Sequence, residues 1–139
     1  MSPTGEPLTH AFAKTLSHGE HLVILCGYYE GLNERIRLGL SDRVVSIGDY
    51  VLTGGELPAM VLIDCVVRMT PGVLGHAGSS LDDSFANGWL EYPQYTRPAS
   101  FRGMKVPAIL RSGDHQQVAT WRRLQAVART ATQRPDLLA

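Results

Sequence analysis

Two glycine-bearing loops are the first candidates for chemistry in this sequence. Segment 27–31 (GYYEG) and segment 46–56 (SIGDYVLTGGE) each follow an apolar run. Glycines there let the backbone turn sharply and come within hydrogen-bonding distance of a ligand. Neither loop has the GxGxxG or GxxxxGK(S/T) pattern of dinucleotide and phosphate cradles, and neither contains a lysine. The loops fit an adenosine with a neutral or zwitterionic tail held by main-chain groups; the alternative is a pair of ordinary tight turns.

Charged residues farther along the chain could act on a bound substrate. Asp82 and Asp83 form an acidic pair, in which like-charge proximity can raise one pKa and suit a proton acceptor; a turn or capping aspartate followed by Ser84 is the alternative. Arg68 stands four residues after Asp64, the spacing of an intrahelical ion pair. It also lies at the mouth of a long loop, where its guanidinium can reach a ligand oxygen. The 5 histidines show no metal-ligand spacing.

The elements expected to position these residues alternate between strands and helices. Apolar runs over 21–27 and 42–48 both end at glycine, which is typical of strands buried on both faces of a parallel sheet. Helices are expected over 32–40 and 56–69, the second with Pro58 in its first turn. This order predicts an α/β fold, in which ligands bind beyond the carboxyl ends of the strands.

The second half of the chain has a different pattern. Between residues 71 and 103 the hydrophobic periodicity disappears, and loops that long are usually functional or linkers. A helix follows over 114–132, with its arginines largely outward. Residues 97–139 carry 8 basic against 2 acidic side chains, whereas residues 1–96 carry 5 against 11. This asymmetry favours a polyanion partner for the basic part, or else a solvated helical face that pairs with the acidic body.

Composition excludes several classes of protein. A chain of 139 residues that is 44% hydrophobic is typical of one globular domain, or one and a small appendage, and not of a disordered chain. The apolar stretch 57–69 is too short to span a membrane and is interrupted by charges. No cationic leader precedes an apolar stretch. Cys26 and Cys65 each sit in an apolar run, so we expect both to be buried and reduced, in a cytoplasmic protein.

Several longer strings resemble one family of enzymes. SPTG at residue 2, LCGYYEG at 25, SIGDYVLTGGELPAMVLID at 46, LEYPQYTRP at 90 and FRGMKVPAIL at 101 are similar to bacterial tRNA (guanine-N1-)-methyltransferases, and the similarity covers nearly the whole chain. The resemblance implies a SPOUT-type α/β trefoil-knot methyltransferase domain, incomplete at its N-terminus, followed by a small helical C-terminal domain. It implies transfer of a methyl group from S-adenosylmethionine to N1 of guanine 37 in tRNA. Family members carry a substantial portion before the SPxG loop, so an N-terminally truncated chain is expected.

The resemblance also implies roles for individual residues. Asp83 would be the general base that takes the N1 proton, and Arg68 would stabilise the negative charge on O6. Magnesium is expected as well, with ligands that stay unassigned. The S-adenosylmethionine site would be formed by the first residues, the two glycine loops and the start of the following helix: Ser2, Pro3, Gly27, Tyr29, Glu30, Gly31, Ser46, Ile47, Gly48, Tyr50, Leu52, Gly54, Gly55 and Pro58.

The same resemblance implies domains and partners. Residues 1–74 would be the C-terminal part of the knotted cofactor-binding domain, 75–90 the interdomain linker, and 91–139 a partial helical tRNA-binding domain. The partners would be a tRNA with guanine at position 37 and a second copy of the chain, with the active site at the subunit interface and no role for a membrane. The alternative is a truncated, inactive remnant that retains only cofactor or RNA binding, and truncation is expected to give poor solubility or no activity.

Overall fold

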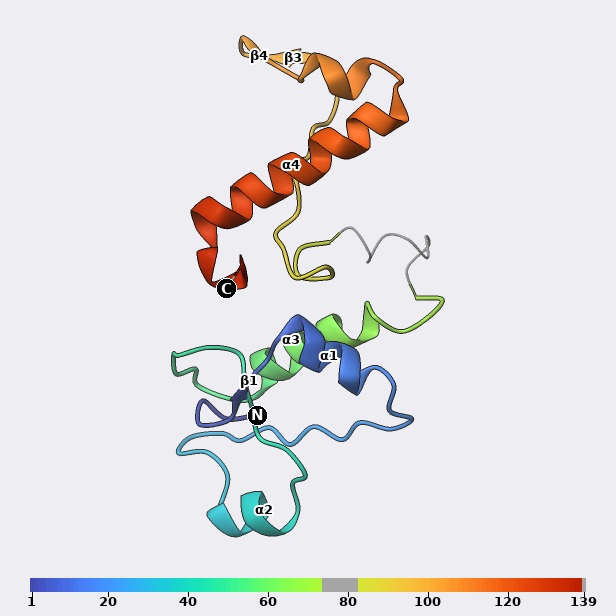
Figure 1. Ribbon diagram of the computed structural model, residues 1–139. Helices are drawn as coiled ribbons and strands as arrows, with labels where there is room; N and C mark the ends of the chain where they lie inside the picture. Colours follow the sequence, from blue (N-terminus) through green and yellow to red (C-terminus); the bar gives the residue numbers. More distant parts are fainter. Residues whose placement is uncertain (74–82, 139) are drawn as a thin grey trace. The chain divides into compact units, whose positions relative to one another are not determined.

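A computed structural model describes residues 1–73 and 83–138 of the chain. The chain divides into two compact units, Met1–Ser80 and Leu81–Ala139, called here the first and the second unit. Both units combine helices with very short strands (Figure 1). The predicted α/β class is confirmed, with sheets of only two strands in the described residues.

The first unit is built on one parallel strand pair. β1 (Glu6–Pro7) pairs with β2 (Val45–Ser46), with Glu6 opposite Val45. β2 lies inside the strand predicted over 42–48, and both of its residues are buried. Parallel strands must be joined by a long crossover, and here the crossover carries the first glycine loop.

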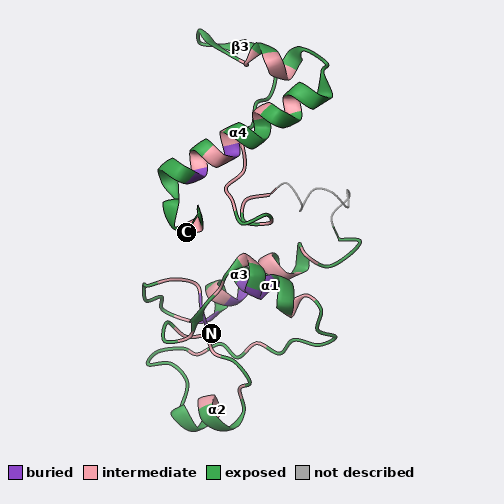
Figure 2. Cartoon of the chain, viewed as in Figure 1, coloured by how far each residue is buried: buried purple, intermediate pink, exposed green. Residues whose placement is uncertain are grey.

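Two helices pack against each other in this unit. α1 (His10–Leu16) begins at Thr9, whose hydroxyl accepts a hydrogen bond from the amide of Phe12 (3.1 Å), the usual device that satisfies a free donor at a helix start. α1 packs against α3 (Glu56–Val67), as Figure 1 shows. The buried hydrophobic residues of this unit come from α1, β2 and α3 (Figure 2): Phe12, Ala13, Val45, Ala59 and Leu62.

α3 confirms the helix predicted from residue 56 and ends two residues earlier than expected. Glu56 lies at its positive end, and Arg68 follows as the capping residue, with its amide donating to the carbonyl of Asp64 (3.1 Å). Although almost every position is apolar, Leu57 and Met60 remain exposed. An all-round apolar sequence indicates burial only where a neighbour is present to cover each face.

The strand predicted over 21–27 is wrong. The segment forms no strand in the described part of the chain, although the carbonyls of Leu25 and Gly27 accept hydrogen bonds from the Met1 amino group and from Gly55, both at 2.8 Å. Without a ladder partner on either side its apolar side chains stay open, and Val23 is 70% exposed. The expected burial of Cys26 is wrong for the same reason, since Cys26 is exposed and Cys65 only half-buried.

The remaining element of the first unit is α2 (Glu34–Gly39), which follows the first glycine loop. It lies within the helix predicted over 32–40. Asn33 precedes it, with its side chain accepting a hydrogen bond from the amide of Arg35 (3.0 Å). Loop 27–31 is therefore followed directly by a capped helix start.

The second unit is organised around one long helix, α4 (His115–Gln133), which confirms the helix predicted over 114–132. Asp114 caps it by accepting from the amide of Gln117 (3.0 Å). Before it come a hairpin and a short 3₁₀ turn, and after it a second such turn: β3 (Ser100–Phe101), β4 (Met104–Lys105), η1 (Ala108–Arg111) and η2 (Pro135–Leu138).

Arginines of α4 contact aromatic side chains of the segment that precedes the hairpin. The guanidinium of Arg122 lies 4.7 Å from the centre of the Tyr92 ring, and that of Arg123 lies 5.9 Å from the centre of a ring of Trp89. Arg122 and Arg123 are exposed, as predicted, although their guanidinium groups rest on aromatic faces, whereas Arg129 is only half-exposed. Of the predicted linker 75–90, residues 75–82 lie outside the described residues, and the rest belongs to the second unit.

Candidate functional site

A cavity of about 980 Å³ lies in the first unit. Its wall is formed by the first residues, segments 21–32 and 41–55, and parts of the three helices. Every residue for which the resemblance implies a role in cofactor binding lines this cavity, from Ser2 to Pro58. The volume is at the upper end of the roughly 300–1,000 Å³ usual for small-molecule sites. The fold thus gathers residues that are more than fifty positions apart in the sequence around one hollow.

The two glycine loops meet directly. The amide of Gly55 donates to the carbonyl of Gly27 at 2.8 Å, and Tyr28 forms an isolated bridge with Gly54. A Cβ on Gly55 would lie 2.8 Å from Cα of Cys26 and 3.0 Å from the nitrogen of Gly27, so only glycine allows this approach. The contact leaves backbone of both loops at the cavity wall, which suits a ligand held by main-chain donors and acceptors.

A second close approach shapes the loop after β2. The hydroxyl of the buried Ser46 donates to the carbonyl of Gly48 (3.1 Å) and accepts from its amide (3.2 Å). The Tyr50 hydroxyl donates to the carbonyl of Ile47 (3.2 Å), and the Tyr50 ring covers Gly48 so closely that a Cβ there would lie 2.5 Å from it. The φ of Gly48 is 152°, which L side chains rarely adopt. This turn is therefore specified by glycine and a folded-back tyrosine.

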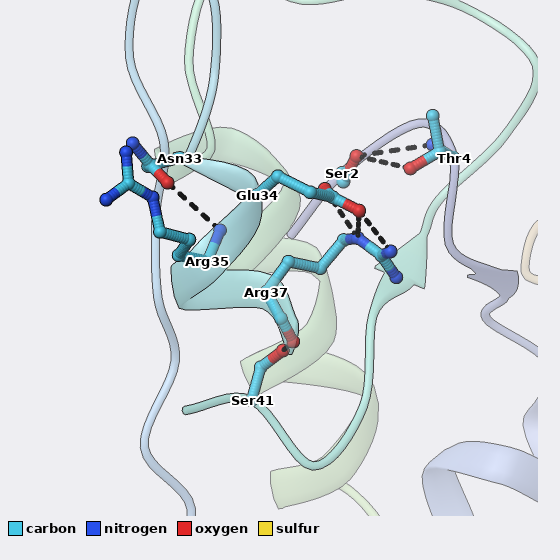
Figure 3. Close-up of polar contacts among 7 residues, drawn as sticks. All are labelled: Ser2, Thr4, Asn33, Glu34, Arg35, Arg37 and Ser41. Atoms are coloured by element: carbon cyan, nitrogen blue, oxygen red, sulfur yellow. Dashed lines mark hydrogen bonds and ion pairs between the residues drawn. The ribbon is translucent and has the colours of Figure 1, made fainter. Parts of the chain in front are cut away.

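The first residues form a turn that closes onto β2. The amide of Ser2 donates to the carbonyl of Val45 (3.0 Å), and the Ser2 hydroxyl accepts from the amide of Thr4 (3.3 Å), a contact drawn in Figure 3. A Cβ on Gly5 would lie 2.5 Å from the backbone of Val44, so this turn also depends on glycine. Ser2 and Pro3 are thereby held at the cavity.

The sequence pattern missed a charged pair in the cavity wall. Glu34 and Arg37 of α2 line the cavity with largely exposed side chains. The Arg37 Nε donates to both carboxylate oxygens of Glu34 (2.9 and 2.8 Å), as Figure 3 shows, and this hydrogen bonding lowers the pKa of Glu34 and raises that of Arg37. The (i, i+3) spacing directly after a glycine loop is the signal that could have indicated them. A zwitterionic ligand would find opposite charges on this wall.

The two candidate catalytic residues belong to different units. Arg68 is exposed at the C-terminal end of α3, and Asp83 is half-buried at the start of the described part of the second unit. The carbonyl of Asp83 accepts from the amide of Ala86 (3.2 Å), so Asp83 begins a tight turn. Asp82, the other member of the acidic pair, lies outside the described residues.

Metal ligands and membrane-spanning helices are two further features of interest. Within residues 1–73 and 83–138 no three or more His, Cys, Asp and Glu side chains gather as metal ligands would. In the same residues every helix is too short or too polar to cross a membrane.

Comparison with known proteins gives a consistent result. The family described as tRNA (Guanine-1)-methyltransferase TrmD matches residues 1–139. A tRNA (guanine-N(1)-)-methyltransferase of Moorella thermoacetica is 60% identical over 139 residues, covering 100% of this chain and 56% of that protein. Proteins of the same name from Geobacillus kaustophilus and Ruminiclostridium cellulolyticum are 59% and 60% identical, each over 99% of this chain and 57% and 59% of their own lengths.

The chain thus spans somewhat more than half the length of the curated relatives it matches. The glycine loops, the turn at Ser2 and the charged residues at 68 and 83 all fall inside the matched region. The chain belongs to the TrmD family of tRNA (guanine-1)-methyltransferases.

Proposed function

We propose that this chain acts in the transfer of a methyl group from S-adenosylmethionine to N1 of guanine 37 in tRNA. The observation that carries the proposal is the cavity whose two glycine loops are joined between Gly55 and Gly27 in a chain of this family. Backbone groups suit the adenosine, and the Glu34–Arg37 pair suits an amino-acid tail. Bound S-adenosylmethionine supplies an electrophilic methyl group. The residues of the cavity wall hold it.

Asp83 and Arg68 carry the chemistry on the guanine side. A neutral guanine is a poor nucleophile at N1 because that nitrogen bears a proton. Asp83 accepts the proton, and the electron pair left on N1 attacks the methyl carbon while the bond from that carbon to the sulfonium sulfur breaks and its electron pair stays on the sulfur. Negative charge that develops on O6 during proton removal is stabilised by the guanidinium of Arg68.

The finer architecture is part of the same proposal. The first unit is the C-terminal part of a SPOUT-type trefoil-knot domain, and the second begins a helical tRNA-binding domain. The protein acts as a homodimer in which Asp83 serves the pocket of the partner chain. Arg122, Arg123 and Arg129 supply phosphate contacts, so affinity for tRNA falls with increasing salt. Stacking on Tyr92 and Trp89 supports this, because it fixes the guanidinium groups before the tRNA arrives.

A second candidate function has its own support. Several large apolar side chains of the first unit are open, among them Val23 at 70% and Val51 at 83% exposure. Such exposure favours a chain that by itself retains cofactor or RNA binding without turnover. The two candidates differ in one measurable property, which is methyl transfer by the 139-residue chain.

The test is transfer of labelled methyl from S-adenosylmethionine to a tRNA transcript with guanine at position 37, with a transcript carrying adenine there as control. We expect label on the guanine transcript alone, and a loss of roughly a hundredfold or more in the Asp83→Asn variant. Asp136→Asn, an exposed acid of the same unit paired with Arg134, should transfer at the unaltered rate. A folded chain that binds the cofactor but labels neither transcript would establish the second candidate, and label on the adenine transcript would contradict the assigned target.

A further inference from the structure

The segment that follows Asp83 closes on itself. We call residues 83–91 the Asp83 loop. The amide of Phe85 donates to the carbonyl of Trp89 (2.7 Å), and the amide of Glu91 donates to the hydroxyl of Ser84 (3.0 Å). Phe85 has a φ of 74°, a conformation that side chains other than glycine seldom adopt. The last residue of the loop is thus bonded to the neighbour of Asp83.

This closed loop is fastened to α4 by two adjacent residues. The hydroxyl of Thr130 accepts from the amide of Leu90 (3.0 Å), and the guanidinium of Arg129 donates to the carbonyl of Glu91 (3.1 Å). These bonds join positions 40 and 38 residues apart. The loop is therefore held by tertiary contacts as well as by its own turn.

Thr130 differs from the other threonines of α4. It has 0% exposure, whereas Thr120 and Thr132 are exposed. All three hydroxyls donate to the carbonyl four residues earlier, at 2.8 Å for Thr130, 3.0 Å for Thr120 and 2.9 Å for Thr132. Of the three, Thr130 also accepts from the loop. A buried hydroxyl costs stability unless it is hydrogen-bonded, and here it bonds on both sides.

We propose that Thr130 is a positioning residue for methyl transfer. Its hydroxyl holds the Asp83 loop in one conformation and so fixes the position of the Asp83 carboxylate. The inference rests on the proposed function of Asp83 as the base. The connection runs from Thr130 to Leu90, through Glu91 to the Ser84 hydroxyl, and so to the adjacent Asp83. A general base must lie within hydrogen-bonding reach of its proton, and a displacement of about 1 Å can cost on the order of a hundredfold in rate.

The kinetic test compares three variants of the 139-residue chain in the same methyl-transfer assay. Thr130→Val keeps the shape of the side chain and removes the hydroxyl. We expect kcat to fall roughly ten- to a hundredfold with the KM for S-adenosylmethionine unchanged. Thr130→Ser restores the hydroxyl and should bring kcat back to within about threefold of the unaltered chain. Thr132→Val removes the matched hydroxyl that does not touch the loop, and it should leave both constants unchanged.

Amide hydrogen exchange supplies a readout that does not depend on turnover. In Thr130→Val the Leu90 amide should exchange at least about tenfold faster, because it has lost its acceptor, while amides in the middle of α4 keep their rates. Thr130→Ser should keep the Leu90 amide protected. This measurement separates release of the loop from unfolding of the helix.

The outcomes separate failure of the inference from failure of the proposed function. If the unaltered chain transfers no methyl group, the proposed function of this chain is wrong and the positioning role fails with it, whatever the exchange data show. If the unaltered chain is active and Thr130→Val keeps its kcat, the positioning role alone is wrong. A fall in kcat that Thr130→Ser does not restore, or that accompanies faster exchange throughout α4, would show a purely structural threonine and also overturn the inference.

Discussion

The two units hold their loops by different means. In the first unit, backbone meets backbone: Gly55 bonds Gly27, and the turn at Ser2 bonds Val45. In the second unit, the side chains of Thr130 and Arg129 on the long helix α4 hydrogen-bond to the Asp83 loop. Loops that meet through glycine leave main-chain groups at a cavity wall, which suits ligand binding. A loop that is hydrogen-bonded to a helix on one side can hold a single side chain in a fixed position, which suits catalysis.

The units also differ in how they treat apolar residues. α3 is apolar at nearly every position, yet Leu57 and Met60 are exposed. α4 is amphipathic, with Ala126 and Thr130 buried and charged residues outward. A helix apolar on all sides needs cover on all sides, whereas an amphipathic one needs a single neighbour. The burial of apolar residues in the first unit therefore depends more on neighbouring segments than it does in the second unit.

The largest expected effect comes from breaking the backbone contacts of the first unit. Gly5→Ala would place a Cβ 2.5 Å from the backbone of Val44, and we expect a cost of about 1–3 kcal/mol together with loss of S-adenosylmethionine binding. Hydrogen exchange should show β1 and β2 opening while α4 keeps its protection. The matched variant is Gly39→Ala in α2, which has no atom within 4 Å of the new Cβ and should be neutral or stabilising. Equal cofactor affinity in Gly5→Ala and the unaltered chain would contradict this account of the turn.

A smaller effect should follow from adding the cofactor itself. At ten times its Kd, S-adenosylmethionine should stabilise the state it binds by about 1.4 kcal/mol, which corresponds to roughly tenfold slower exchange. We expect this protection at amides of the cavity loops, such as that of Gly55, and not at the amide of Arg134, which bonds Thr130 at the end of α4. S-adenosylmethionine without its carboxylate would test the role of the Glu34–Arg37 pair. Uniform protection across both units would remove the distinction between them.

The smallest effect concerns the start of α4. Hydrogen bonding from the amide of Gln117 holds the pKa of Asp114 below its ordinary value of 3.8. A depressed carboxyl pKa means that this stabilisation is complete above pH 3.8 and is lost as the pH falls through the lower value of the folded state. As the pH falls below 3.8, the far-UV ellipticity of the unaltered chain should therefore decline more than that of Asp114→Asn. The asparagine caps the helix but has no carboxyl group to protonate. Identical pH profiles would show that the cap contributes nothing to α4.

Local sequence signals predicted the helices well. The α3 and α4 predictions were within two residues at each end, because Glu56, Pro58 and Asp114 are start signals that act within one turn. The strand over 21–27 failed because a strand exists only with a neighbour to pair, and an apolar run does not name that neighbour. Helical periodicity likewise tells which residues of α2 share a face and not what that face meets, so it gave no sign that Glu34 and Arg37 line the cavity.

The candidate site divides in the same way. Glycines at 27, 48, 54 and 55 left two readings open, a close backbone approach or ordinary tight turns, and the match to the family over residues 1–139 indicated the chemistry. The contact of Gly55 with Gly27 and the fastening of the Asp83 loop by Thr130 carried no sequence signal.

What the sequence by itself determined is therefore the local structure and the inventory of reactive groups: the helices with their caps, the glycine loops, and the residues at 68 and 83. Only the tertiary structure decided that the loops share one cavity with the Glu34–Arg37 pair and that Thr130 is bonded to Leu90, 40 positions away. The physical reason is the range of the forces. Capping, turn preference and helical periodicity act within a few residues, whereas a cavity and a buried hydrogen bond depend on which distant segments are brought together by packing.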